Sequence, residues 1–475
     1  MRDCRKFFID GRWVQPNETC DLAIENPATE KVVAVISEGT AIDVNQAVEA
    51  ARRAFTEFSQ TTKETRLALL QHLLSIYMDR YEEMAQAIHL EMGAPIDFAR
   101  NEQADCGRGH LQSAINALQH YPFEQTIENS QIIKEPIGVC GLITPWNWPI
   151  NQIACKVAPA LATGCTIVLK PSEIAPLSAY LFAEMIDEAG FPPGVFNLVN
   201  GSGGIVGTAL AEHPDIDMVS FTGSTQAGIA VAKAAANSVK RVTQELGGKS
   251  PNILLSDLPG ADFERAIKKG IFMCMENTGQ SCNAPTRMLI PQSRYQEAQA
   301  LAKESVQLVK VDNPEKPGRH LGPVASRDQY LKVQQLIQNA LDEGATLIAG
   351  GTGKPEGLKT GHYVRPTIFA DVDNSMTIAR EEVFGPVLVM IPYNNEEEAI
   401  SIANDTPYGL SAYVQTADVE KGKQLARQLR AGMVRINHAP HSYDAPFGGY
   451  KQSGNGREWG EHGFEDYLEI KAISI

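Results

Sequence analysis

Hydrophobic positions in the first quarter of the chain recur at the spacing of a helix. In residues 43–58, and again in residues 63–92, apolar side chains fall three and four positions apart and so share one face of a helix. Gly93 and Pro95 come next, and both residue types favour the end of a helix. We therefore predict a mainly helical first quarter.

From residue 139 onward, short runs rich in branched apolar residues alternate with longer helical patterns. The runs are 139–143, 166–169, 195–199 and 218–221, and the helical patterns are 151–163, 177–189 and 205–212. Such repeats predict right-handed crossovers and a mostly parallel, doubly wound sheet. A second series of the same kind starts at residues 252–255 and reaches residues 328–343, which predicts a second α/β domain.

Two segments fit neither series. Residues 127–135 and residues 467–475 alternate apolar and polar side chains loosely, as a strand does. An isolated ribbon is only marginally stable in water. We therefore predict that both segments are strands that need a partner from outside.

Composition and charge exclude several classes of function. The chain has 475 residues, of which 43% are hydrophobic and 21% charged, and this is enough apolar material for large cores. Its net charge of -15 opposes approach to nucleic acid or to an anionic membrane. The charged N-terminus has no apolar run behind it and no stretch of 18 apolar residues occurs, so we expect a cytoplasmic protein that binds neither membrane nor nucleic acid. The eight cysteines show no C-x-x-C spacing, and no metal site is indicated.

Three motifs contain residues that can take part in catalysis. Cys282 lies in a polar, glycine-containing loop where a thiolate is accessible, although an inert loop cysteine has the same pattern. Glu245 precedes a Gly-Gly pair and can act as a general base or simply flank a turn. Asn147 follows a predicted strand within T-P-W-N-W-P, where its amide can donate to an oxyanion or belong to a rigid packing corner.

Two further motifs suit a nucleotide. Lys170 and Glu173 follow a predicted strand and combine a cation with a carboxylate that can bind ribose hydroxyls. Gly223 and Ser224 lie between a strand and a helix, where backbone N–H groups can face a phosphate. The residues around Gly223 do not complete a Walker A motif, and no full G-x-G-x-x-G fingerprint is present.

Seven motifs follow one another along the chain. In order they are T-P-W-N-W-P, K-P-S-E, F-T-G-S-T, E-L-G-G-K-S-P, G-Q-S-C, E-E-V-F-G-P-V and P-F-G-G-Y-K-Q-S-G. Together they resemble the aldehyde dehydrogenase superfamily, from about Phe8 to the C-terminus. The resemblance implies an α/β fold with two doubly wound parallel-type domains and a small β oligomerisation arm. The implied boundaries are 1–120 and 137–246 for a Rossmann-like dinucleotide-binding domain, 247–445 for a catalytic domain, and 121–136 and 460–475 for the arm of a homodimer or homotetramer.

The resemblance also implies a reaction. Cys282 matches the nucleophile through which the family converts an aldehyde to a carboxylic acid, by way of a thiohemiacetal and a thioester. Asn147 matches the oxyanion donor, Glu245 the base that activates water, and Glu458 a second carboxylate that assists proton movement. Two alternatives remain. One is a coenzyme A-acylating aldehyde dehydrogenase, which generally lacks the base, and the other is a non-catalytic binding protein on the same fold.

The implied cofactor is NAD, with NADP less favoured, because Glu173 can accept from a free 2'-hydroxyl but repels a 2'-phosphate. The implied cofactor-binding residues are Ile143, Thr144, Pro145, Trp146, Lys170, Glu173, Gly203, Gly223, Ser224, Leu246, Glu382 and Phe384. The residues expected to line the aldehyde site are Trp148, Gln152, Cys155, Ser281, Asn283, His441 and Phe447. This mixed lining favours polar or aromatic aldehydes, and it includes no arginine to pair with a substrate carboxylate.

Overall fold

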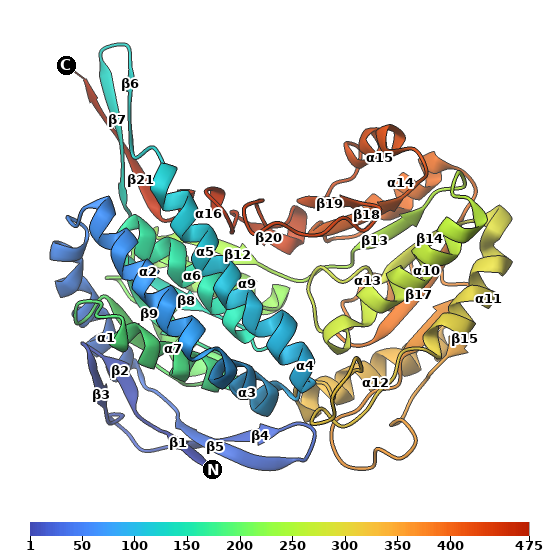
Figure 1. Ribbon diagram of the computed structural model, residues 1–475, viewed down its shortest axis with the longest axis horizontal. Coiled ribbons are helices and arrows are strands. Elements are labelled where there is room, and N and C mark those ends of the chain that lie inside the picture. The colour runs from blue at the N-terminus through green and yellow to red at the C-terminus, as the bar shows by residue number, and fades with distance from the viewer. Residues whose placement is uncertain (475) are drawn as a thin grey trace.

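The computed structural model describes residues 1–474 as two α/β lobes with a projecting β arm (Figure 1). An eight-stranded sheet forms the first lobe in the order β20-β12-β11-β8-β9-β10-β2-β3. Its strands are β2 (Phe7–Ile9), β3 (Arg12–Val14), β8 (Val139–Ile143), β9 (Thr166–Lys170), β10 (Phe196–Leu198), β11 (Met218–Thr222), β12 (Arg241–Glu245) and β20 (Gly454–Asn455). The five strands from β12 to β10 run parallel, so the predicted doubly wound sheet is confirmed.

Helices cover both faces of this sheet. They are α1 (Ala41–Phe58), α2 (Lys63–Asp79), α3 (Tyr81–Met92), α4 (Ile96–Phe98), α5 (Ala104–His120), α6 (Pro149–Thr163), α7 (Leu177–Glu188), α8 (Thr208–Glu212) and α9 (Thr225–Ala235). The helical pattern predicted over residues 63–92 is two helices, which meet at Arg80. A separate three-stranded sheet comprises β1 (Arg2–Cys4), β5 (Lys31–Ser37) and β4 (Asp21–Asn26).

The second lobe contains a seven-stranded sheet in the order β15-β16-β17-β14-β13-β18-β19. Its strands are β13 (Pro251–Leu254), β14 (Arg287–Pro291), β15 (Thr346–Ala349), β16 (Thr367–Ala370), β17 (Val387–Tyr393), β18 (Ser411–Gln415) and β19 (Met433–Ile436). Its helices are α10 (Gly260–Met275), α11 (Tyr295–Val306), α12 (Arg327–Asp342), α13 (Thr377–Arg380), α14 (Glu396–Asn404) and α15 (Val419–Ala426). All strand pairs except β15 with β16 are parallel, as a second α/β domain requires.

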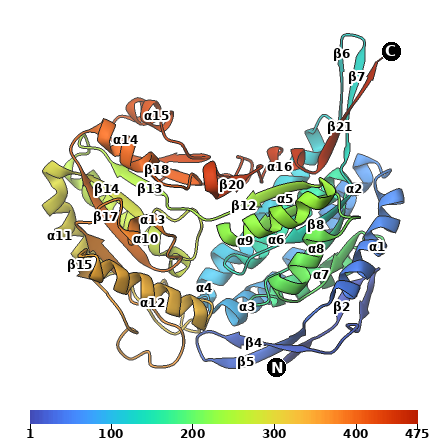
Figure 2. The ribbon, with the colours of Figure 1, turned by 180° about the vertical axis from the view of Figure 1, so that it is seen from behind.

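The arm consists of β6 (Glu124–Ile127), β7 (Ser130–Pro136) and β21 (Leu468–Ser474), and it extends away from the first lobe (Figure 2). The two segments that were predicted to be strands in need of a partner form a pair with each other. In this pair, β21 runs antiparallel to β7 along its whole length. The short helix α16 (His462–Glu465) lies before β21, and its Phe464 is buried in the core of the first lobe. The structure therefore places residues 462–465 in the first lobe, although the sequence had assigned them to the arm. Among residues 1–474, no helix is both long and apolar enough to cross a membrane.

Candidate active site

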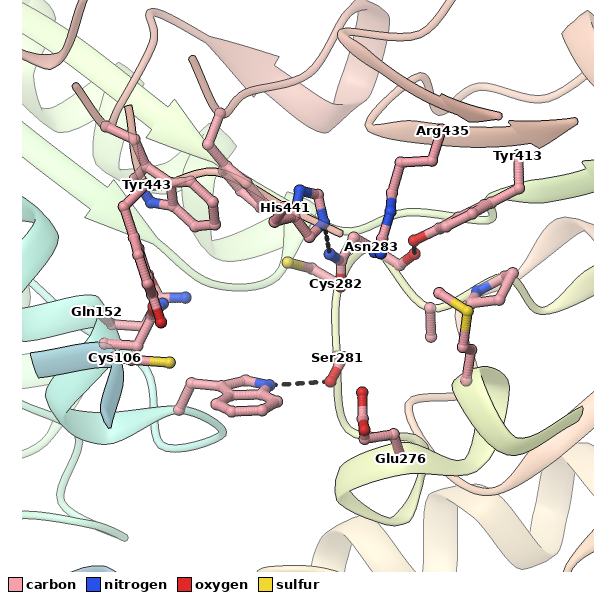
Figure 3. Close-up of a pocket in the computed structure, with 17 residues that line it drawn as sticks. Cys106, Gln152, Glu276, Ser281, Cys282, Asn283, Tyr413, Arg435, His441 and Tyr443 are labelled. Carbon is pink, nitrogen blue, oxygen red and sulfur yellow. Dashed lines mark hydrogen bonds between the residues drawn. The ribbon is translucent and has the colours of Figure 1, made fainter. Parts of the chain in front are cut away.

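Two cavities meet at Cys282, between the lobes. The first, of about 160 Å³, lies at the carboxyl ends of β8, β11 and β12, where the strand order reverses and an open α/β sheet binds its ligands. The second, of about 220 Å³, opens on the other side of the cysteine loop (Figure 3). Cys282 and Gln152 line both cavities. The thiol is therefore accessible to two different ligands at once.

The loop that carries Cys282 is held in an unusual backbone conformation. Asn277, Thr278 and Gly279 have φ values of 52°, 57° and 72°, three left-handed residues in succession. A Cβ atom at Gly279 would lie 2.0 Å from the carbonyl oxygen of Gly385, so only glycine fits there. Gln103 donates to Asn277 Oδ1 at 2.9 Å and fixes the loop to the first lobe. This strain is typical of a functional loop whose surroundings impose its shape.

The surroundings of Cys282 shift the pKa of its thiol. Burial raises its pKa above the ordinary cysteine value, and the nearby carboxylates of Glu382 and Glu245 raise it further. The backbone N–H groups of Cys282 and Asn283 act in the opposite direction. Because a thiol is a weak nucleophile, its attack on a carbonyl needs a group that takes the proton.

Asn147 lies in the loop after β8, close to the cysteine loop. Its side chain is buried, and Nδ2 donates to the carbonyl oxygen of Gln280 at 3.0 Å. Asn277 in turn donates to the Asn147 carbonyl oxygen at 2.7 Å. A carboxamide nitrogen has two hydrogens, so the second can serve an oxyanion formed next to Cys282.

Glu245, the last residue of β12, is buried and lines the first cavity with Cys282. Neither of its carboxylate oxygens has a hydrogen-bond partner within the described chain. Burial raises its pKa well above the ordinary carboxyl value, and the charge of Glu458 adds to this, whereas Lys156 and Arg457 oppose it. A carboxyl group with a raised pKa binds a proton more strongly than an ordinary one, as a general base requires.

Glu458 is held by groups that do not line either cavity. Lys156 Nζ donates to Glu458 Oε1 and, at 2.9 Å, to Ser220 Oγ. Burial lowers the pKa of Lys156, but the charge and hydrogen bond of Glu458, together with the charges of Cys155 and Glu245, outweigh that effect and the net pKa is raised. Cys155 Sγ donates to Glu458 Oε2 at 3.3 Å. Lys156 and Glu458 thus form a buried ion pair beside Glu245.

The sequence did not indicate Lys156, and its prediction for Cys155 does not match the geometry. Both residues lie in α6, every residue of which is buried. Cys155 contacts Glu458 and is not part of the cavity lining. The sequence does contain a signal for Lys156, which is a single lysine within an apolar helix. A buried ammonium group requires an ionic partner, so such a lysine indicates a buried ion pair.

Seven of the predicted cofactor residues line the first cavity. They are Pro145, Trp146, Gly223, Ser224, Leu246, Glu382 and Phe384. Thr222 and Gly247, together with Gln329 and Lys332 from α12, also line this cavity and were not predicted. Gln329 Nε2 donates to the Phe384 carbonyl oxygen at 2.8 Å, and Glu382 accepts from the Gly248 N–H at 2.8 Å. The Glu382 side chain and the Phe384 backbone are therefore held in place.

The other five predicted cofactor residues lie outside that lining. They are Ile143, Thr144, Lys170, Glu173 and Gly203. Three of these form a group of their own, since Lys170 Nζ donates to Glu173 at 2.8 Å and the Gly203 backbone N–H also lowers the Glu173 pKa.

Ser224, which lines the first cavity, begins α9, where its hydroxyl accepts from the Ala227 N–H at 3.3 Å.

The second cavity contains six of the seven predicted substrate residues. They are Trp148, Gln152, Ser281, Asn283, His441 and Phe447. Trp148 Nε1 donates to Ser281 Oγ at 2.9 Å (Figure 3). The cavity also contains Cys106, Glu276, Tyr413, Arg435, Tyr443 and Trp459, which the sequence had not indicated. An arginine therefore does face this cavity, contrary to the expectation from the sequence.

No group of three or more potential metal ligands is found in the described part of the chain. His438 and His441, three positions apart, have separate surroundings: His441 lines the second cavity, and His438 lines a different one.

Comparison with known proteins identifies the class to which this site belongs. A family model described as "Aldehyde dehydrogenase family" matches residues 13–473, so the chain belongs to the aldehyde dehydrogenase family. The family resemblance inferred from the seven motifs is confirmed.

The individual relatives cover the whole chain. A Pseudomonas sp protein named 3-succinoylsemialdehyde-pyridine dehydrogenase is 55% identical over 100% of this chain and 99% of its own length. A mutant of aldehyde dehydrogenase C from Pseudomonas syringae, in complex with NAD+ and octanal, has a TM-score of 0.98 and 53% identity and covers 99% of this chain and 96% of its own. The Mycobacterium tuberculosis aldehyde dehydrogenase in complex with NAD+ has a TM-score of 0.96 and 40% identity and covers 100% and 98% of the two chains.

Proposed function

We propose that this chain oxidises an extended, uncharged aldehyde to a carboxylic acid with NAD and releases the acid by hydrolysis. The observation that carries the proposal is the position of Cys282 at the meeting point of two cavities, one of which also contains Glu245. With this arrangement, an aldehyde bound in one cavity and a hydride acceptor bound in the other would both lie next to Cys282. The names of the two Pseudomonas relatives, which mention a pyridine semialdehyde and octanal, support the substrate class.

Cys282 and Asn147 would carry the first step. The thiol sulfur adds to the aldehyde carbon, its proton leaves to a nearby base, and the carbonyl oxygen becomes an oxyanion of the thiohemiacetal. The second N–H of Asn147, which lines the first cavity with Cys282, and the backbone N–H of Cys282 would stabilise that charge, at about 3 kcal/mol per donor.

A dinucleotide would occupy the first cavity and extend beyond it to Gly203, Lys170 and Glu173. The backbone is open at Gly203, where an added Cβ would meet nothing within 4 Å, and Ser224 begins a helix whose N-terminus favours a phosphate. Glu382 and Phe384 line the cavity together with Cys282, and Lys170 with Glu173 would hold the adenosine ribose. When bound there, NAD supplies the hydride acceptor that turns the thiohemiacetal into a thioester.

Glu245 would then activate water. It lines the cavity beside Cys282, and its unpartnered oxygens are free to accept a proton from a water molecule that attacks the thioester. The Lys156–Glu458 pair lies next to it and can carry the proton away. A base in this position favours hydrolysis over transfer of the acyl group to coenzyme A.

The experiment that tests the proposal follows reduced nicotinamide with octanal as substrate. We expect one equivalent of octanoate for each NAD reduced, at a rate that coenzyme A does not change. Turnover that requires coenzyme A would identify the acylating reaction instead. Absence of both NAD binding and turnover would support a non-catalytic binding protein.

Glu173 gives a prediction on cofactor choice. Burial raises its pKa, but Lys170 and backbone donors outweigh that effect, so the net pKa is lowered and the carboxylate stays ionised at neutral pH. We expect kcat/KM with NAD to exceed that with NADP by about tenfold or more, since the charge repels a 2'-phosphate. Changing Glu173→Gln should reduce this ratio. Equal efficiency of the wild type with both cofactors would contradict the assignment.

We also propose that the chain forms a homodimer or homotetramer in the cytoplasm through its arm. Ile127, Ile470 and Ile473 on the arm are 53%, 70% and 41% exposed in a single chain. Exposed apolar side chains on a strand ribbon are typical of a surface that a second chain covers.

A further inference from the structure

The second cavity has a charged wall that the proposed chemistry does not use. Arg435, on β19, faces the cavity that holds Cys282. Its Nε donates to the Ala439 carbonyl oxygen, and its Cζ lies 5.6 Å from the ring centroid of Tyr413. No carboxylate within residues 1–474 lies within ion-pairing distance of it. The guanidinium is thus held in position without a counter-ion.

One other charged group faces the same cavity. Glu276 lies across the opening from Arg435 (Figure 3). Burial and the charge of Glu102 raise the Glu276 pKa, and the charges of Arg319 and Arg435 lower it in part. His441 is neutral near pH 7, because burial and then Arg435 lower its pKa to about 4. A carboxylate on a ligand would therefore be attracted by Arg435 and repelled by Glu276.

Apart from these charges, much of the cavity wall is aromatic. Phe447 stacks on Trp459 with ring centroids 4.5 Å apart, and Trp148 and Tyr443 complete the wall. Such a wall suits a chain or ring of low polarity. A purely alkyl tail that reaches Arg435 would displace water from a guanidinium and return no hydrogen bond.

We propose that Arg435 is a specificity-determining residue that donates to a neutral hydrogen-bond acceptor on the tail of the aldehyde, such as a ketone oxygen or a ring nitrogen. Arg435 has five N–H donors, of which the bonds to Ala439 and to the Tyr413 side chain use two, so the others remain for a ligand. The inference rests on the proposed function and refines its substrate class. The enzyme then favours acceptor-bearing aldehydes over plain alkyl aldehydes of equal length.

A matched series of substrates tests this. Octanal is compared with four oxo-octanals that carry a ketone at carbon 4, 5, 6 or 7, and with the same-length aldehyde that ends in a carboxylate. In the wild type, we expect at least one oxo-octanal to exceed octanal in kcat/KM. In Arg435→Met, the ratio of kcat/KM for that oxo-octanal to kcat/KM for octanal should fall about tenfold or more.

Two control variants separate specificity from general damage. Arg435→Lys should recover part of the preference, and Arg427→Met, the same change at an exposed arginine of the same lobe, should leave it intact. An unchanged ratio in Arg435→Met, or an equal loss for all substrates, would overturn the inference. So would a wild-type preference for the carboxylate over every ketone. If the wild type oxidises none of the series with NAD, the proposed function itself fails.

Discussion

Replacing Cys282 with alanine is expected to abolish aldehyde oxidation and to lower kcat/KM by about 10⁴-fold or more. The reason is geometric, since Cys282 is the one thiol in the described chain that lines both cavities. Without it no covalent adduct forms between the aldehyde and the enzyme. The measurement is the steady-state rate of nicotinamide reduction with octanal, alongside NAD binding by fluorescence quenching.

Cys106 provides the matched control. It also lines the second cavity, but not the first, and its sulfur donates to the Glu102 carbonyl oxygen at 3.3 Å. Burial raises its pKa to about 12. We expect Cys106→Ala to retain turnover within about threefold and both variants to bind NAD, since neither thiol supports the fold. Substantial activity in Cys282→Ala together with its loss in Cys106→Ala would reverse the assignment.

The sequence predicted the parts of the site that are local in the chain. Asn147, Glu245 and Cys282 each lie in a loop or at a strand end with a short recognisable motif, and the structure brings Glu245 and Asn147 into one cavity with Cys282. Parallel strands explain this success, because their carboxyl ends meet at one edge of the sheet. The same rule indicated Gly223 and Ser224.

The sequence could not predict contributions that depend on packing between distant segments. Arg435 and Tyr443 reach the second cavity from the end of the second lobe. Their positions depend on how the two lobes meet, which no local pattern records. The lining of the aldehyde site was therefore incomplete.

Helix α6 shows a second limit. A helix with one buried face can be oriented from its apolar stripe, but every residue of α6 is buried and no stripe distinguishes its sides. Gln152 therefore reaches the cavities as expected, whereas Cys155 and Lys156 turn to Glu458. The sequence located the helix but not the direction of its side chains.

Changing Glu245→Gln is expected to lower kcat by about 10²- to 10³-fold while leaving the first turnover. Glutamine keeps the shape of the buried side chain but cannot take a proton from water. The thioester on Cys282 should therefore form and accumulate, and rapid mixing should show a burst of reduced nicotinamide close to one per active site. Glu212→Gln, at an exposed position in α8, is the control and should behave as the wild type.

The pH dependence gives an independent test of the same role. A general base acts only when deprotonated, and burial with the Glu458 charge raises the Glu245 pKa well above 4.5. The wild-type rate of thioester hydrolysis should therefore be lost as pH falls through that raised pKa and recovered as pH rises through it. In Glu245→Gln this acidic limb should disappear. A variant that keeps the limb, or that loses the burst together with kcat, would show that Glu245 does not act as the hydrolytic base.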